Sequence, residues 1–203
     1  MNVFVEGGGD YDALLQACRR GFKLFFEKAG LKGRLPRVYP CGSGNSAYEA
    51  FCEARRQGKP AILLVDSEDL ITNLDPATGL TLDPWQHFIN RGDPWERPAG
   101  ATNDHAQLMA VCMETWFLVD WQTTGAFYGR HFDASALPAR PQKEAVPKLD
   151  VFKALKKATA ATTKRGYSKG GHSFDLLAEL KPAVVEAGAP HAHRLLVYLR
   201  ANC

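Results

Sequence analysis

Acidic residues follow three apolar segments of the 203-residue chain, each at the point where a strand would end. They are Glu6, Asp66, Glu68 and Glu114, with Asp69 next to Glu68. Ligands of an open α/β sheet bind outside the carboxyl ends of its strands, so these side chains are expected to converge. Carboxylates about 5 Å apart repel by roughly 3 kcal/mol per pair at an effective dielectric constant near 20, and a hard divalent cation, Mg²⁺ or Mn²⁺, relieves this repulsion. The spacing equally allows each acid to cap a separate helix.

Three glycines, Gly7, Gly8 and Gly9, follow the first acid directly. Glycine lets the backbone approach a phosphate, and the N-terminus of a following helix attracts an anion. These glycines are therefore candidates for binding a phosphate, although a tight turn between strand and helix would use the same residues. The turn has no Gly-Lys-Ser/Thr, and Asp12 stands where Gly-x-Gly-x-x-Gly requires its last glycine, which excludes the usual nucleotide-binding motifs.

The cysteines, serines and histidines give weaker evidence for a catalytic or metal site than the acidic residues do. Cys41 and Cys112 have no evident histidine partner, and the sequence around Ser43 is not a Gly-x-Ser-x-Gly elbow. His191 and His193 are poorly spaced for a metal pair on a helix, so surface histidines are expected. The chain has five cysteines without a Cys-x-x-Cys pair, which indicates free thiols and argues against a disulfide framework or a zinc ribbon.

Alternating strands and helices are needed to position the acids. Strands are expected at 2–5, 37–40, 60–65 and 107–112, and helices at about 11–29 with Asp10 as the cap, from about 44, from about 113, and at 150–161, 173–180 and 190–200. The run 60–65 is apolar throughout, as in a parallel strand covered on both faces. The pattern predicts an α/β fold with a Rossmann-like, mostly parallel sheet flanked by helices.

An ordered but irregular insertion is expected at about 70–104, where periodicity stops and prolines are frequent. Trp85 and Trp95 are its most prominent side chains. They could stack on nucleic-acid bases, but tryptophans in such loops more often pin the loop to the body, and we favour pinning.

Charge divides the chain into two parts. Residues 1–139 carry 13 Lys and Arg against 17 Asp and Glu, whereas residues 140–203 carry 12 against 5. We therefore expect an α/β domain at 1–139 and a basic, helical lobe at 140–203 packed on it. The basic lobe suits a phosphate polyanion such as nucleic acid. Its densest segment contains Lys164, Arg165, Tyr167 and Lys169, although a solvated turn would also account for these residues.

No apolar run reaches the roughly 18 residues of a membrane span, and the N-terminus lacks the pattern of a signal peptide. The expectation is a cytoplasmic protein without a membrane partner.

Two short motifs resemble the Toprim domain of topoisomerases, primases and overcoming-lysogenization-defect nucleases. They are Val5-Glu6-Gly7 and Asp66-Ser67-Glu68. A closer resemblance, over nearly the whole chain, is to the domain-of-unknown-function family DUF4276. Its motifs match Phe4–Asp10, Leu64–Asp69, Cys112–Asp120 and Tyr167-Ser168-Lys169. This family is regarded as Toprim-like and is associated with ATPases in defence-type gene neighbourhoods.

The resemblance implies roles for single residues. Glu6, Asp66 and Glu68 would hold magnesium, Glu114 would be the additional acid of the nuclease branch, and Lys169 would lie near the phosphate. Glu68 stands where the Toprim pattern has Asp, which leaves the number of metal ions open. The implied function is a Mg²⁺-dependent phosphodiesterase acting on nucleic acid. The alternative is a non-catalytic, metal-binding partner or sensor subunit of an ATPase.

Overall fold

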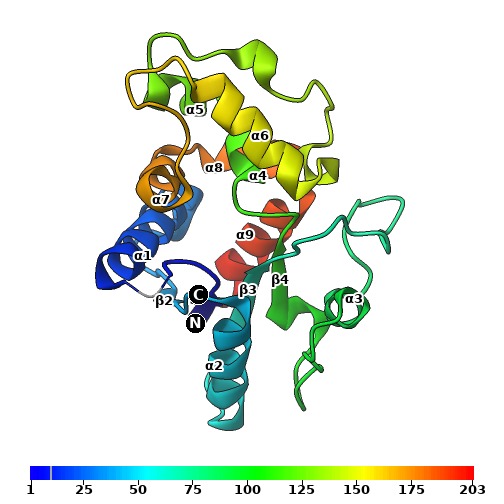
Figure 1. Cartoon of the computed structure of the whole chain (residues 1–203). Helices are drawn as coiled ribbons and strands as arrows, with labels where there is room; N and C mark the ends of the chain where they lie inside the picture. Colours follow the sequence, from blue (N-terminus) through cyan, green and yellow to red (C-terminus); the bar gives the residue numbers. More distant parts are fainter. Residues whose placement is uncertain (10) are drawn as a thin grey trace.

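A sheet of four parallel strands lies at the centre of the protein, with helices on both faces (Figure 1). The computed structural model describes residues 1–9 and 11–203. In chain order the strands are β1 (Asn2–Val5), β2 (Arg37–Pro40), β3 (Ala61–Asp66) and β4 (Ala106–Met109). Their order across the sheet is β2-β1-β3-β4. The predicted α/β class with a parallel, helix-flanked sheet is confirmed.

Helices account for most of the remaining regular structure. They are α1 (Asp12–Phe26), α2 (Gly44–Arg56), α3 (Pro84–Arg91), α4 (Thr115–Val119), α5 (Trp121–Tyr128), α6 (Lys148–Thr159), α7 (Lys169–Glu179), α8 (Pro182–Gly188) and α9 (Pro190–Asn202). A π-helical turn, Glu27–Leu31, extends α1, and 3₁₀ turns lie at Asn103–His105, Ala134–Ala136 and Lys143–Ala145. Among the described helices, none combines the length and the apolar composition needed to cross a bilayer.

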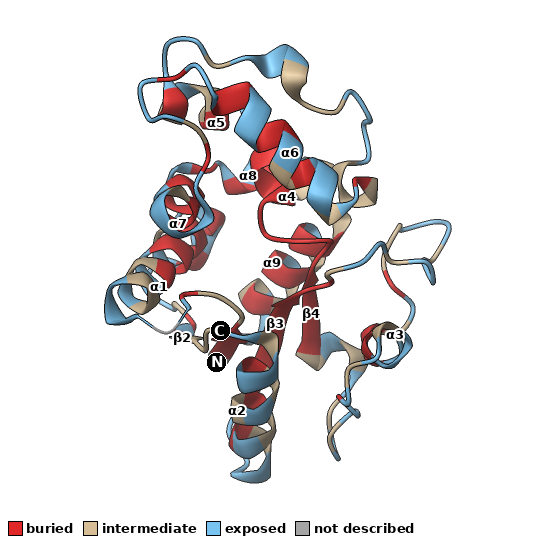
Figure 2. Cartoon of the chain, in the orientation of Figure 1, coloured by how far each residue is buried: buried red, intermediate tan, exposed pale blue. Residues whose placement is uncertain are grey.

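Side chains along the central strands alternate between two cores, because successive residues of a strand point to opposite faces. Val3 and Val5 belong to a core shared with α1, α7 and α9. Phe4 belongs to a second core shared with α2 and α3. Every residue of β3 is buried (Figure 2), which explains the uninterrupted apolar run that the sequence shows there.

The strand order reverses beside β1, which brings the first two acidic motifs together. The chain passes from β1 to β2 on one side and later to β3 on the other, so the carboxyl ends of β1 and β3 are neighbours. Val5 pairs with Leu64, and the N–H of Glu6 donates to the Leu64 carbonyl at 2.9 Å. Open α/β sheets bind ligands at such a reversal.

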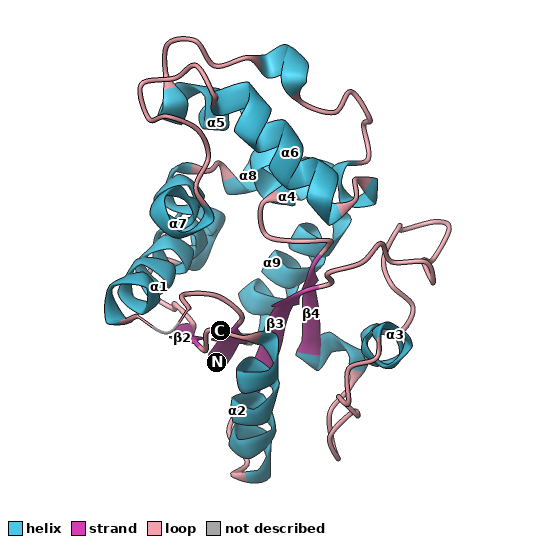
Figure 3. Ribbon diagram, in the orientation of Figure 1, coloured by secondary structure: helices cyan, strands magenta, loops and turns pink. Residues whose placement is uncertain are grey.

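The segment 70–104 was expected to be irregular, but it contains α3 (Figure 3). Asp83 caps this helix by accepting from the Trp85 N–H, Pro84 occupies its first turn, and Gly92 follows its end with a φ of 93°. These are ordinary start and stop signals, which the surrounding prolines obscured.

Trp85 and Trp95 pin this segment to the body, as predicted. Their exposed fractions are 3% and 4%, and both lie in the core formed with α2. The Trp85 indole donates to the Thr102 carbonyl at 3.1 Å, and the Trp95 indole donates to the Asn45 side chain at 3.2 Å. Neither ring is free to stack on a base.

The remaining differences concern element bounds. Helices α6 and α7 begin at Lys148 and Lys169, earlier than expected, and α8 was not expected. Strand β4 ends at Met109, three residues before the predicted end. The predicted cap of α1, Asp10, lies outside the described residues.

Candidate metal centre

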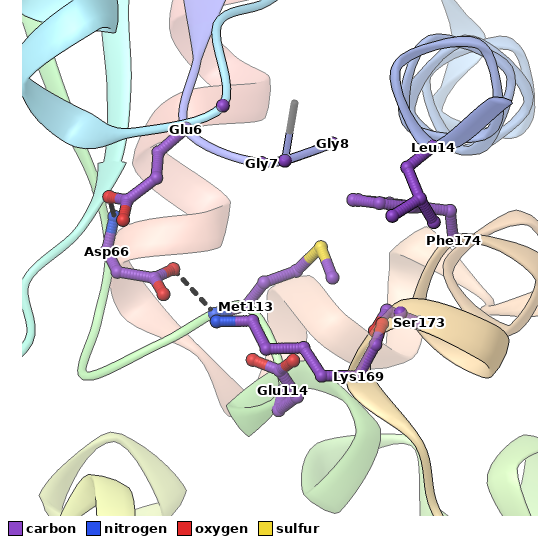
Figure 4. A pocket seen from close by; sticks show the side chains of 13 residues that line it. Glu6, Gly7, Gly8, Leu14, Asp66, Met113, Glu114, Lys169, Ser173 and Phe174 are labelled. Carbon is purple, nitrogen blue, oxygen red and sulfur yellow. Dashed lines mark hydrogen bonds between the residues drawn. The ribbon is translucent and has the colours of Figure 1, made fainter. Parts of the chain in front are cut away.

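Glu6, Asp66 and Glu68 meet at the carboxyl edge of the sheet. One carboxylate oxygen of each lies within 4.8 Å of the others. Glu6 and Asp66 project into a pocket of about 400 Å³ beyond the ends of β1 and β3 (Figure 4). The switch in strand order explains this meeting, since the first two residues are 60 positions apart.

Hydrogen bonds fix the orientation of two of these carboxylates. Oε2 of Glu6 accepts from the N–H of Asp66 at 3.1 Å, and Oδ1 of Asp66 accepts from the N–H of Met113 at 2.9 Å. Each acid is therefore held by the strand or loop that carries its neighbour, and Glu6 does not cap a helix of its own.

Glu114 lies in the same pocket, directly before α4. Its residue is fully buried, and its side chain makes no capping hydrogen bond to α4. Oε1 accepts from the Tyr167 hydroxyl at 2.6 Å, whereas Oε2 has no hydrogen-bond partner among the described residues. Figure 4 shows Glu114 and Lys169 across the pocket from Glu6 and Asp66. The idea that each acid caps a separate helix is wrong for both Glu6 and Glu114.

The environments of Glu6 and Asp66 favour the protonated forms of these two acids when no cation is bound. Burial, followed by repulsion from Glu6 and Glu114, raises the pKa of Asp66 to about 8. Burial, followed by repulsion from Glu68, also raises the pKa of Glu6. The charges of Lys148 and Lys169 oppose both shifts without cancelling them.

Lys148 is a site residue that the sequence did not reveal. Its Nζ lies 2.5 Å from Oε1 of Glu68 and 3.4 Å from Oδ2 of Asp66. It comes from the start of α6, more than 80 positions after Asp66, and nothing local marks it among the many lysines of the basic lobe.

Lys169, the first residue of α7, lines the pocket. Its Nζ lies 5.5 Å from the centre of the Phe152 ring. Helix α7 comes close to α1 at Gly21, where a Cβ atom would lie 2.7 Å from the Phe174 carbonyl oxygen. This close packing fixes the start of α7 next to the acids.

The glycine-rich turn forms one wall of the pocket. Gly7, Gly8 and Gly9 line it, and all three have positive φ, which side chains other than glycine rarely adopt. Gly7 and Gly42 exchange backbone hydrogen bonds of 3.0 and 2.9 Å, so the loops after β1 and β2 are joined.

Two non-glycine residues with positive φ lie beside the acids: Glu68, with a φ of 62°, and Val111, with a φ of 63°. Such a conformation is unfavourable for a β-branched side chain. The Glu68 N–H donates to the Val111 carbonyl at 3.0 Å, and the Val111 N–H donates to the Ser67 hydroxyl at 2.7 Å. The turn at Val111 ends β4 early and directs the chain toward Met113 and the pocket.

Helix α3 supports the Asp66 motif from outside the pocket. Nη1 of Arg91 donates to the Asp66 carbonyl at 3.0 Å, and the His87 ring lies 2.9 Å from the Ser67 carbonyl through Nε2. The Arg91 guanidinium also lies 5.4 Å from the centre of the Trp95 ring. The sequence pattern predicts no helix in this segment, so neither Arg91 nor His87 was predicted as a site residue.

Two sequence expectations near the C-terminus need correction. Tyr167 is 5% exposed and bonds to Glu114, so it is not part of an exposed basic and aromatic surface, although Lys164 and Arg165 are exposed. His191 is 2% exposed, not a surface residue. Its Nδ1 lies 2.7 Å from Glu144, and its Nε2 accepts from the Thr81 N–H.

The family model described as "Domain of unknown function (DUF4276)" matches residues 5–200. The chain belongs to the DUF4276 family. The DUF4276 match contains the whole pocket, from Glu6 to Phe174. No curated protein and no solved structure matches the chain.

The acids of this DUF4276 protein fit a hard divalent cation. Glu6, Asp66 and Glu114 in the pocket, and Glu68 beside Asp66, offer only oxygen atoms. The free Oε2 of Glu114 is a buried acceptor without a donor, a state that costs free energy unless a cation or a donor meets it. Burial, and then repulsion between carboxylates, raises the pKa values of Asp66 and Glu6, so a bound cation would stabilise their ionised forms.

Proposed function

We propose that this protein is a Mg²⁺- or Mn²⁺-dependent phosphodiesterase that acts on nucleic acid in the cytoplasm. The observation that carries the proposal is the cluster of Glu6, Asp66 and Glu68, of which Glu6 and Asp66 line a pocket together with Glu114 and Lys169. The Toprim resemblance of the motifs agrees with it, and fold alone would not be sufficient.

In this proposal Glu6, Asp66, Glu68 and Glu114 hold the metal. A divalent ion bound there supplies Lewis-acid activation of the phosphate and lowers the pKa of bound water. Lys169 neutralises charge that develops on the phosphate oxygens. The backbone at Gly7–Gly9 lets a phosphate approach closely, because no Cβ atoms obstruct that wall.

The basic lobe provides the surface for the polyanion. Lys153, Lys156 and Lys157 are exposed along α6, the helix that begins at Lys148 beside the acids. Phosphates bound by these ammonium groups would release counterions, and this release favours binding at low salt.

The test is cleavage of labelled DNA and RNA in Mn²⁺, with Glu6→Gln and Glu114→Gln as variants. Both keep the side-chain shape but remove a ligand charge, so cleavage should be lost while the far-UV spectrum stays unchanged. Glu53→Gln is the control, because Glu53 is exposed on α2 and pairs with Arg56. Cleavage that persists in both pocket variants, or in EDTA, would contradict the proposal.

One observation favours the alternative, a non-catalytic metal-binding partner of an ATPase in a defence-type system. Lys148 already offsets part of the charge of Asp66 and Glu68, which reduces the need of these two acids for a catalytic ion. Metal binding without cleavage of any nucleic acid, with and without the neighbouring ATPase, would select this alternative.

A further inference from the structure

The Lys148 ammonium contacts two carboxylates of the acid cluster at once. Its Nζ lies 2.5 Å from Glu68 and 3.4 Å from Asp66. By contrast, Lys169 forms no ion pair with any described residue, although it lines the same pocket. The two lysines therefore have different positions relative to the acids.

The backbone and the surroundings of Lys148 hold its ammonium in place. Lys148 is the first residue of α6, after Pro147, and its side chain is 21% exposed. Its ammonium therefore lies between two carboxylates, at a position set by the start of α6.

The charges around the pocket limit how many divalent ions it can take. When Glu6, Asp66, Glu68 and Glu114 are all ionised, they outnumber Lys148 and Lys169 by two charges. One divalent ion balances this difference. A second would leave an excess of two positive charges beside the buried Asp66 and Glu114, which is costly at low dielectric.

We propose that the Lys148 ammonium takes the place of a second divalent ion, so that the pocket binds one Mg²⁺ or Mn²⁺ per chain. The inference rests on the metal binding of the proposed function and gives it a stoichiometry. Lys148 is a charge-compensating residue that holds Glu68 and one oxygen of Asp66. The single ion is left to Glu6, to the other oxygens of Asp66 and Glu68, and to the free Oε2 of Glu114, the same four acids as in the proposed function.

The test is a titration of the intact chain with Mn²⁺. Calorimetry measures the number of ions bound, and electron paramagnetic resonance shows whether a bound ion is isolated or close to a second one. Wild type should bind one Mn²⁺ with the signal of an isolated ion. Lys148→Gln should bind two, with the exchange-coupled signal of a close Mn²⁺ pair. Lys148→Arg keeps the charge and should bind one. Lys59→Gln, at an exposed lysine beyond the opposite end of β3 from Asp66 and outside the polyanion surface, should also bind one.

Two ions in wild type would overturn this inference but leave metal binding in place, and that measurement needs no variant to fold. One ion in a folded Lys148→Gln variant, at any affinity, would overturn it as well. No ion in wild type would contradict the proposed function itself, and the inference with it. Circular dichroism of each variant shows whether it is folded.

Discussion

Tyr167 donates its hydroxyl to Oε1 of Glu114 at 2.6 Å, while Oε2 of the same carboxylate has no partner among the described residues. One oxygen thus fixes the carboxylate and the other remains available in the pocket. The Tyr167 hydroxyl also lies 2.9 Å from the Ser173 hydroxyl, which connects the anchor to α7. The buried acid is therefore oriented before any ligand arrives.

Removing this anchor should destabilise the metal-free protein. Tyr167→Phe leaves a buried carboxylate oxygen without a donor, at a cost of about 1–3 kcal/mol. The midpoint of thermal unfolding should fall by several degrees. Tyr48→Phe is the matched control, because the Tyr48 hydroxyl donates to the Glu96 carbonyl at an exposed position. Its unfolding midpoint should fall by less. Equal falls in the two midpoints would show that the Glu114 contact adds nothing to stability.

The raised pKa of Glu6 gives metal-free stability a pH dependence. The folded protein keeps the Glu6 proton at pH values where the unfolded chain has released it, so stability falls as pH rises from 4.5 through the raised pKa. Glu6→Gln removes this titration but keeps an acceptor for the Asp66 N–H. The variant should therefore unfold at a higher temperature than wild type at pH 8, with little difference at pH 4.

Thermal unfolding in EDTA at a series of pH values tests this prediction. The difference between variant and wild type must grow with pH. Adding Mn²⁺ at pH 8 should reverse the ranking, because only wild type retains the full set of carboxylates. A constant difference in unfolding temperature across the series would mean that folding does not raise the pKa of Glu6.

The contact between α1 and α7 predicts a sharp effect of a single methyl group. A Cβ atom at Gly21 would lie 2.7 Å from the Phe174 carbonyl oxygen, so Gly21→Ala must push the two helices apart, at a cost of about 1–3 kcal/mol. At Gly170, also in a helix, a Cβ atom would lie 4.0 Å from its nearest neighbour, Cδ1 of Leu14. Gly170→Ala should be neutral or stabilising. Urea unfolding of the two variants measures both effects.

Nucleic-acid binding should depend on the lysines of α6. Lys156 and Lys157 are exposed, and replacing both with Gln should reduce the slope of log affinity against log salt by up to about 2 units. Replacing Lys32 and Lys59, which are exposed on the acidic part of the chain, should leave the slope unchanged. Filter binding or fluorescence anisotropy over a salt series is the measurement. Equal slopes in all three proteins would remove α6 from the interface.

Local patterns were sufficient to predict the strands and the meeting of three acids. The strand β3 is apolar because both of its faces are covered, and Glu6 and Asp66 follow strands whose ends are neighbours. Both signals lie within a few residues of the sequence. The position of Glu114 depends in addition on a turn at Val111, which lies between the end of β4 and the pocket.

Residues brought in by tertiary packing could not be predicted in this way. Lys148 and Tyr167 reach the acids from segments that are distant in the sequence. Before the packing is known, other lysines of the basic lobe look equally suitable as partners of the acids. The position of Arg91 against the Asp66 carbonyl depends on how α3 packs. Helix α3 itself had readable signals in Asp83 and Gly92, and only its proline-rich context hid them.

The order of the charged residues along the chain has a consequence for biosynthesis. Glu6, Asp66, Glu68 and Glu114 leave the ribosome before Lys148 and Lys169. At roughly 5–20 residues per second, the nascent chain spends seconds with the acids made and their ammonium partners still unsynthesised. The sheet edge cannot reach its final electrostatic balance until α6 and α7 have emerged and docked. Completion of this pocket is therefore a late step in the folding of the protein.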